Sequence, residues 1–283
     1  MLGQLGEGAK FLAGGQSLIP LLKLRFANPE HLVDLNFVPS TSFIREDSGA
    51  LNSGVLRFGA MTRHAEIEHS ALAKKIPVLH DCAAGIADVQ VRNRGTIGGS
   101  LAEADPSGDW ANALITLETT VHCLGPDCAR AIPLKDFIKD AYTTALAHDE
   151  LVTEVEVKIP PKGSGGAYLA FKRSAPVYPS ASAAVQLTMA GDVCQDAAIA
   201  LGCVGLTTIR ATEAETALRG KNLNDKTIAI AAEAARAAAD PQADMRGSAD
   251  YKRQLVVALV MRAIQIAARR ARGEQVEGAH LYA

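Results

Sequence analysis

The sequence predicts an α+β protein built from two domains, and three observations support this expectation. The chain has 283 residues, of which 48% are hydrophobic, so it is long enough and apolar enough to form two cores. Residues 160–166 read PPKGSGG, the composition of a linker. Strands alternate with helices before this segment, whereas three strands and then only helices follow it. We therefore expect one domain over residues 1–162 and a smaller one over residues 167–283.

Short elements are expected throughout the first domain. A helix remnant at the start leads into a strand, a glycine-rich turn and a second helix. Thr62 is suited to cap the next helix, on which His64 and His69 are expected to be solvated. Pro77 is expected to kink or split a helix over residues 70–86. Further strands are expected at 31–35, 55–60, 119–124 and 151–159, a helix at 110–117, and a strand end entering a helix at 132–137.

The second domain is predicted to combine a three-stranded antiparallel sheet with helices. The strands are expected at 167–172, 182–189 and 198–204, and the helices at 212–218, 225–239 and 251–272. Arg262 interrupts the apolar face of the last helix, which falls short of the roughly 20 apolar residues that a membrane span needs. We expect a packed helix and no membrane span.

Two glycine-rich turns are the candidate functional segments. In the first glycine turn (residues 13–18), an apolar strand runs into Gly14 and Gly15, and Ser17 stands where a helix N-cap belongs. A strand, a glycine turn and a new helix N-terminus leave backbone N–H groups that can bind an anion. In the second glycine turn (residues 96–100), two glycines stand between two hydroxyl residues, Thr96 and Ser100. Two such turns suit a dinucleotide pyrophosphate held from two sides.

The second turn taken alone is open to another interpretation. Asp105 and Asp109 follow it, and a carboxylate cannot serve a phosphate. These aspartates would accept hydrogen bonds from ribose hydroxyls or cap the following helix. A simple tight turn with Asp109 as an N-cap explains the segment equally well.

The order of the motifs resembles the FAD-carrying medium subunit of molybdenum hydroxylases, and most of all the carbon monoxide dehydrogenase medium-subunit family. The resemblance covers essentially the whole chain. It is carried by AGGQSLIPLLKLR at 13–25, GAMT at 59–62, VRNRGTIGGSLAEADPSGD at 91–109, YTTAL at 142–146, DELV at 149–152, FKR at 171–173 and RGSADY at 246–251.

This resemblance implies a fold and an electron-transfer role. The fold would be a two-lobed FAD-binding domain of the PCMH/vanillyl-alcohol-oxidase type, divided near residue 54, followed by a carbon monoxide dehydrogenase flavoprotein-like domain. Non-covalent FAD would receive electrons from [2Fe-2S] clusters on a small subunit and pass them to an external acceptor. Molybdopterin would lie on a large subunit that chooses the substrate, in a dimer of heterotrimers. The resemblance implies neither a catalytic residue nor a metal ligand on this chain.

The same resemblance implies which residues hold FAD. Backbone N–H groups would line the pyrophosphate on one side from Ala13, Gly14, Gly15, Gln16, Ser17 and Leu18, and on the other from Thr96, Ile97, Gly98, Gly99 and Ser100. Asp109 matches an FAD-contacting aspartate, and Leu151 and Val152 match apolar positions near the isoalloxazine. Lys172 matches a basic residue whose charge would stabilise reduced anionic flavin. Tyr178 is a looser match to a residue that shields one flavin face, and a half-exposed loop tyrosine is the alternative.

Two departures from the family pattern are visible. The family has an extra strand and most of a helix before the first motif, so the native start is expected upstream of Met1, or the domain edge is less protected. Glu103 stands where His, Asn or Thr is commoner. Its carboxylate would either shift the flavin potential or point to solvent.

Composition limits the remaining functions. A net charge of −2 argues against nucleic acid as a partner. Five cysteines, with no Cys-x-x-Cys and no secretory leader, predict reduced thiols in a cytoplasmic protein. Two other functions stay open. One is a stand-alone FAD-dependent oxidoreductase, for which Glu103 is the candidate base. The other is a non-catalytic assembly subunit.

Overall fold

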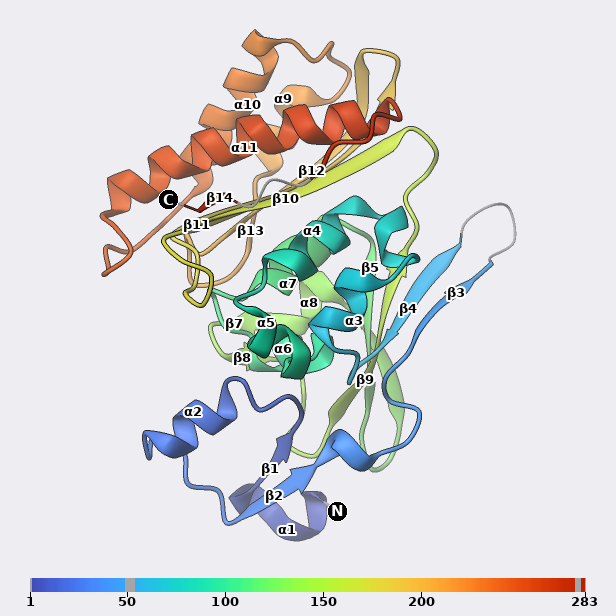
Figure 1. The fold of residues 1–283 in the computed structure, drawn as a ribbon, viewed down its shortest axis with the longest axis vertical. Helices are drawn as coiled ribbons and strands as arrows, with labels where there is room; N and C mark the ends of the chain where they lie inside the picture. The colour runs from blue at the N-terminus through green and yellow to red at the C-terminus, as the bar shows by residue number, and fades with distance from the viewer. Residues whose placement is uncertain (1, 49–53, 278–280, 283) are drawn as a thin grey trace.

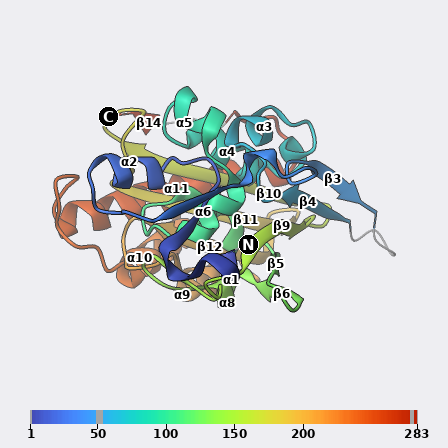
Figure 2. The same ribbon diagram turned by 90° about the horizontal axis from the view of Figure 1, so that it is seen from below.

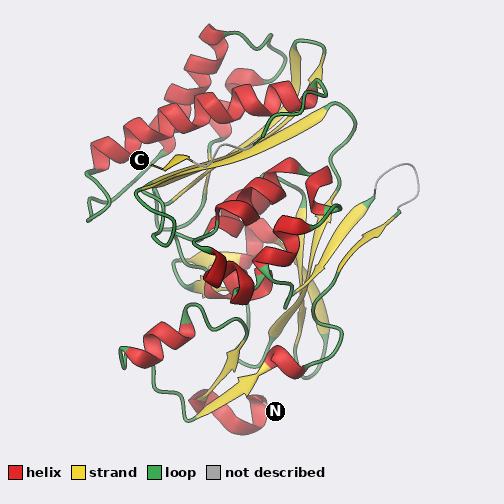
Figure 3. Cartoon of the chain, viewed as in Figure 1, coloured by secondary structure: helices red, strands yellow, loops and turns green. Residues whose placement is uncertain are grey.

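A computed structural model describes residues 2–48, 54–277 and 281–282 of the chain. Figure 1 shows three tiers: a small N-terminal lobe at one end, a central group of helices beside a sheet, and a C-terminal sheet covered by long helices. Figure 2 views the molecule from the N-terminal end, and Figure 3 separates helices, strands and loops by colour. Among the residues described, no helix has both the length and the hydropathy of a membrane span.

The N-terminal lobe is a parallel pair of short strands with a helix in the crossover. β1 (Ala9–Leu12) runs parallel to β2 (His31–Asp34), in a register that pairs Ala9 with His31. Parallel neighbours need a crossover connection, and this one contains the first glycine turn and α2 (Leu18–Lys23). α1 (Leu2–Leu5) and the short 3-10 turns η1 (Gly6–Gly8) and η2 (Leu35–Phe37) complete the lobe.

The central tier packs short helices on one face of a five-stranded antiparallel sheet. The strand order is β3 (Ile44–Asp47), β4 (Val55–Gly59), β9 (Leu151–Lys158), β5 (Thr119–Leu124) and β6 (Ala129–Pro133). The helices are α3 (His64–His69), α4 (Pro77–Gly85), α5 (Val89–Arg94), α6 (Ile97–Glu103), α7 (Asp109–Ile115) and α8 (Leu134–Phe137). The remaining short elements are η4 (Ala73–Lys75), β7 (Ile138–Asp140) and β8 (Thr143–Thr144). Phe58, Trp110 and Phe137 are fully buried in the shared core.

The expected division near residue 54 does not separate two sheets. Residue 54 lies between β3 and β4. These two strands pair with each other, in a register that runs from Ile44 opposite Phe58 to Asp47 opposite Val55. The change of sheet falls earlier, between the end of β2 at Asp34 and the start of β3.

The C-terminal sheet has five strands, and the prediction of three was incomplete. Its order is β13 (Ile209–Arg210), β12 (Val193–Gly202), β11 (Ala181–Ala190), β10 (Ser164–Lys172) and β14 (Leu281–Tyr282). The helices α9 (Thr212–Leu218), α10 (Asp225–Ala238) and α11 (Ala249–Ala271) belong to the same tier (Figure 1). β13 and β14 have two residues each, too few to show a pattern in the sequence, and β14 is added in parallel to the end of β10.

Both faces of this sheet are buried, which explains its continuous apolar strands. Along β10, Tyr168 and Ala170 join the core of the central tier, whereas Ala167 and Leu169 join the core beneath α10 and α11. The sheet is therefore the shared wall between the two halves of the chain.

A buried ion pair crosses this wall. Arg270 of α11 contacts Asp81 of α4 through two bonds, Nη1 to Oδ2 at 2.6 Å and Nη2 to Oδ1 at 3.1 Å. The side chains are 8% and 1% exposed. The amide of Tyr168 also donates to Asp81, at 3.2 Å. The α11 helix is thus fixed to the central tier by charge as well as by packing.

Several expected boundaries are confirmed. The strand at 119–124 and the helix at 212–218 coincide with β5 and α9, and Pro77 begins α4 after a short 3-10 turn, so the expected helix is split. The expected cap at Thr62 was wrong. Its hydroxyl bonds the backbone of Phe43 instead, and the helix begins at His64.

Candidate functional site

The two glycine turns meet at one cavity of about 600 Å³, a volume typical of small-molecule sites. Its walls come from all three tiers of the molecule. Of the fifteen residues predicted to hold a cofactor, all but Ile97 line it: Ala13, Gly14, Gly15, Gln16, Ser17, Leu18, Thr96, Gly98, Gly99, Ser100, Asp109, Leu151, Val152 and Lys172. Ile97 is fully buried in the central core together with Leu101, because both project from the inner face of α6.

Direct contact between the two turns explains why glycine is needed. A Cβ on Gly14 would lie 2.2 Å from the carbonyl oxygen of Arg94 and 2.8 Å from the Cα of Gly95. A Cβ on Gly99 would lie 2.7 Å from Thr96 Oγ1 and 3.4 Å from the Cβ of Ala13. A side chain at either position would push the turns apart or fill the space between them.

The first glycine turn presents unpaired backbone donors. Within the described chain, no backbone or side-chain acceptor bonds the amides of Gly14, Gly15, Gln16 or Ser17. The backbone of Gly15 has φ +74°, a conformation that glycine adopts without strain. Adjacent free N–H groups in such a turn form a concave site for an anion.

The second glycine turn differs from the prediction, because four of its five amides, those of residues 97–100, are used within the protein. The amides of Ile97 and Gly98 donate to the carbonyls of Thr62 and Ala60, at 3.1 and 2.9 Å. The amide of Gly99 donates to Thr96 Oγ1 at 3.1 Å, and that of Ser100 donates to the Thr96 carbonyl at 3.0 Å. The start of α6 is thereby fixed against the end of β4. This turn offers hydroxyl groups and a surface without Cβ atoms, whereas the run of consecutive free N–H groups lies on the first turn.

Another part of the wall is mainly apolar, with one buried charge. Leu151 and Val152 contribute from the start of β9, and Lys172 from the end of β10. Lys172 is 4% exposed, and its ammonium group donates to the carbonyl of Gly85 at the end of α4. This bond holds a positive charge at the cavity, where burial would make it effective on a bound ligand.

Acidic groups and tyrosines form a further section of the wall. Glu103 is half-buried and lines the cavity. Burial raises the pKa of Glu103, and the nearby charge of Asp105 adds to the shift. Tyr178 also lines the cavity and is 49% exposed. Its pKa is raised, first by burial of the hydroxyl group and then by the nearby charge of Asp105. Asp109 accepts a bond of 2.5 Å from the buried hydroxyl of Tyr168.

His64 is a cavity residue that the sequence analysis placed in solvent. It is 5% exposed, and its Nδ1 accepts a 3.0 Å hydrogen bond from the indole N–H of Trp110. Burial lowers the pKa of His64 to about 3, with smaller contributions from Arg63 and Arg92. The expectation was wrong because the partner is 46 residues away and the helical spacing of His64 and His69 carries no trace of it.

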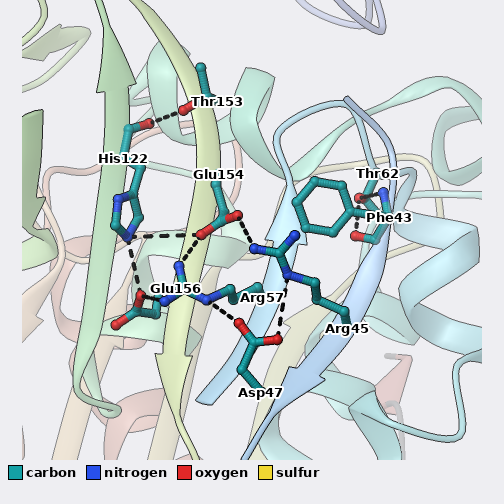
Figure 4. A network of polar contacts seen from close by, with 9 residues as sticks. All are labelled: Phe43, Arg45, Asp47, Arg57, Thr62, His122, Thr153, Glu154 and Glu156. Atoms are coloured by element: carbon teal, nitrogen blue, oxygen red, sulfur yellow. Dashed lines mark hydrogen bonds and ion pairs between the residues drawn. The ribbon is translucent and has the colours of Figure 1, made fainter. Parts of the chain in front are cut away.

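A different group of residues has the spacing of a metal site, but an arginine already occupies its centre (Figure 4). His122 Nε2 lies 3.3 Å from Glu156 and 3.9 Å from Glu154. Arg57 pairs with both carboxylates, at 2.6 Å for Glu156. None of these residues lines the cavity. The guanidinium group of Arg57 neutralises the carboxylates that a cation would need. These four residues therefore form a charge network on the sheet surface.

Comparisons with known proteins agree in fold and in sequence. Residues 1–161 match the family described as the FAD binding domain in molybdopterin dehydrogenase. Residues 166–267 match the CO dehydrogenase flavoprotein C-terminal domain.

Individual relatives match over nearly their whole length. The carbon monoxide dehydrogenase medium chain of Afipia carboxidovorans is 39% identical, over 96% of this chain and 93% of its own. The 6-hydroxypseudooxynicotine dehydrogenase complex subunit alpha of Paenarthrobacter nicotinovorans is 38% identical, over 96% and 91%. A solved carbon monoxide dehydrogenase from Hydrogenophaga pseudoflava, which lacks the Mo-pyranopterin moiety of its cofactor, superposes with a TM-score of 0.90 at 40% identity, over 95% and 92%.

Proposed function

This chain belongs to the family of FAD-binding subunits of molybdopterin dehydrogenases, and we propose that it transfers electrons from a [2Fe-2S] partner subunit, through FAD in the cavity, to an external acceptor. It is an FAD-binding subunit of an oxidoreductase complex. One observation carries the assignment of the site. Both glycine motifs of the family line one cavity, and one of them presents a run of unpaired amides there.

The residues of the cavity fit the chemical groups of FAD. The free N–H groups of residues 14–17 suit the pyrophosphate. Gly99 lines the cavity without a Cβ, so a ligand can approach the backbone of the second turn there. Leu151 and Val152 offer apolar surface to a flavin ring, and Lys172 offers a buried positive charge. When bound, FAD supplies the redox group, and the protein supplies its orientation and electrostatic surroundings.

The chain is proposed to work as the middle member of a larger complex. Relatives of matching length are named as medium chains or as subunits of dehydrogenase complexes. We infer a large molybdopterin subunit and a small [2Fe-2S] subunit as partners, in a dimer of heterotrimers, with the large subunit choosing the substrate. A cytoplasmic location is supported by five cysteines that form no disulfide.

The first test is an absorbance spectrum of the purified chain, with chromatography of whatever acid or heat releases. We expect flavin bands and FAD in the supernatant. A colourless chain that also fails to bind added FAD would overturn the assignment of the cavity.

Electron transfer needs a second measurement. The FAD-loaded chain would be mixed with the reduced [2Fe-2S] subunit of its proposed complex, and flavin bleaching would be followed by stopped flow. Bleaching supports the proposed route. Bleaching by a small organic substrate without any partner would instead support a stand-alone oxidoreductase.

A further inference from the structure

The N-terminal lobe is joined to the rest of the molecule by few polar contacts. Among the described residues, two side-chain hydrogen bonds join residues 2–38 to residues 54–277. One links His148 to the carbonyl of Gly6, at 2.9 Å, on the surface. The other links Arg63 to Asn36 and is partly buried between the two glycine turns. Since the first glycine turn belongs to the lobe, the shape of the cavity depends on how the lobe is held.

The backbone of Arg63 is fixed to the second glycine turn. Arg63 and Thr96 form an antiparallel bridge. On either side of it, the Thr62 carbonyl accepts from the Ile97 amide and the His64 amide donates to the Gly95 carbonyl, both at 3.1 Å. The position of Arg63 is therefore set by the same strand end that fixes α6.

The side chain of Arg63 reaches from there to the first glycine turn. Its Nη1 donates to the carbonyl of Arg94, and its Nη2 donates to Oδ1 of Asn36. Asn36 in turn donates through Nδ2 to the carbonyl of Ala13, at 3.0 Å. Asp34 orients this amide, since it accepts from the Asn36 backbone N–H at 2.9 Å and from Nδ2 at 2.5 Å. One continuous chain of bonds thus joins the two turns.

We propose that Arg63 and Asn36 are positioning residues that set the separation of the two glycine turns and thereby the affinity for FAD. This inference rests on the proposed placement of FAD in the cavity. A guanidinium group holds two acceptors at once in a planar fork, which a lysine ammonium on a flexible stem cannot reproduce. Gly14 packs so closely against Arg94 that even one added methyl group would collide there, so the distance between these two segments is narrowly fixed. Loss of either side chain would leave the free amides of the first turn without a fixed position.

The test measures FAD affinity and the local motion of the apoprotein in parallel. FAD would be titrated into Arg63→Met, Asn36→Ala and the double variant of the full chain, and the Kd read from flavin fluorescence. Hydrogen exchange of residues 9–18 would be followed by mass spectrometry without FAD. Arg45→Met is the matched control, because Arg45 forms surface ion pairs with Asp47 and Glu154 and does not line the cavity.

We expect each single substitution to weaken FAD binding by about tenfold or more. The double variant should be no weaker than the weaker single variant, because the two side chains act as one unit. Exchange over residues 9–18 should be faster in all three variants and unchanged in Arg45→Met. Arg63→Lys should behave more like Arg63→Met than like the native chain.

Other results would overturn the inference. Kd values within twofold of the Arg45→Met control, with native exchange over residues 9–18, would show that the bonds do not position the turn. Additive losses in the double variant would show two independent effects. If the native chain binds no FAD, the proposed function fails, and the exchange data on the apoprotein still decide whether the bonds hold the lobe. If the Arg63 variants misfold, Asn36→Ala still tests the inference, because it leaves the bond from Arg63 to Arg94 intact.

Discussion

The indole N–H of Trp110 donates a 3.0 Å hydrogen bond to Nδ1 of His64, and both rings are buried beside the second glycine turn. Because Nδ1 accepts, the proton of the neutral imidazole lies on Nε2. Trp110 is fully buried in the central core, so the pair connects that core to the cavity wall.

The buried imidazole predicts a loss of stability in acid. The pKa of His64 is lowered from 6.5 to about 3, so below pH 6.5 the unfolded chain binds a proton that the folded chain does not. Stability should fall as the pH drops through this window and level off near pH 3, by about 1.4 kcal/mol for each unit of pKa difference. Urea unfolding of the native chain and of His64→Gln across this range measures the effect. Parallel curves for the two proteins would contradict it.

The ion pair between Asp81 and Arg270 predicts strong coupling between the two halves of the chain. Asp81→Asn should destabilise the protein by about 3–5 kcal/mol, because it leaves a buried guanidinium without its counter-charge. The double variant Asp81→Asn with Arg270→Met should recover part of that loss. Denaturant unfolding of the native chain, Asp81→Asn, Arg270→Met and the double variant gives the coupling energy in a double-mutant cycle. A coupling near zero would mean that packing alone holds α11 to the central tier.

Gly15 and Gly220 offer a matched test of the first glycine turn. Their φ angles are +74° and +71°, so alanine at either position should cost a similar strain of about 1–2 kcal/mol. A Cβ on Gly220 has nothing within 4 Å, whereas one on Gly15, which lines the cavity, would lie 2.8 Å from Cγ1 of Ile19. Gly15→Ala should therefore weaken FAD binding by roughly tenfold or more, and Gly220→Ala should leave it unchanged. Equal affinities, measured by fluorescence titration, would exclude a role for the turn.

The position of Glu103 at the cavity predicts that its protonation changes the midpoint potential of the bound flavin. Burial and Asp105 raise the pKa of Glu103, so its charge appears at a higher pH than for an ordinary glutamate. Below that pKa the side chain is neutral, and the native chain and Glu103→Gln should have equal midpoint potentials. Above it the native carboxylate disfavours the added electrons, and its potential should fall below that of the variant. Spectroelectrochemical titration over a range of pH would check this, and a constant difference would count against it.

Local patterns predicted much of the secondary structure, and the family resemblance predicted cofactor-binding residues of which all but Ile97 line the cavity. Pro77 and the residues of β5 carry signals within a few positions of themselves, and both the helix split at Pro77 and the strand at 119–124 are confirmed. The glycine turns were found through ordered motifs, and the fold brought nearly all of those residues to one cavity.

What could not be predicted depends on partners distant in sequence. The amides of Ile97 and Gly98 are paired by the carbonyls of Thr62 and Ala60, a contact between segments almost forty residues apart. His64 is buried against Trp110, whereas it was expected to be a solvated residue of a surface helix. The bond from Arg63 to Asn36 links the N-cap position of α3 to the 3-10 turn η2, two segments that lie 27 residues apart in the sequence. In each case tertiary contacts override the local preference.

Because few polar contacts hold the N-terminal lobe, the stability of the chain should depend on whether FAD is bound. A ligand that contacts both the lobe and the central tier binds the folded chain and not the unfolded one, so it stabilises the fold by mass action. Protease resistance of the lobe and the melting temperature should then rise with the concentration of free FAD. The supply of flavin would in this way set how much of the newly made chain persists long enough to be assembled.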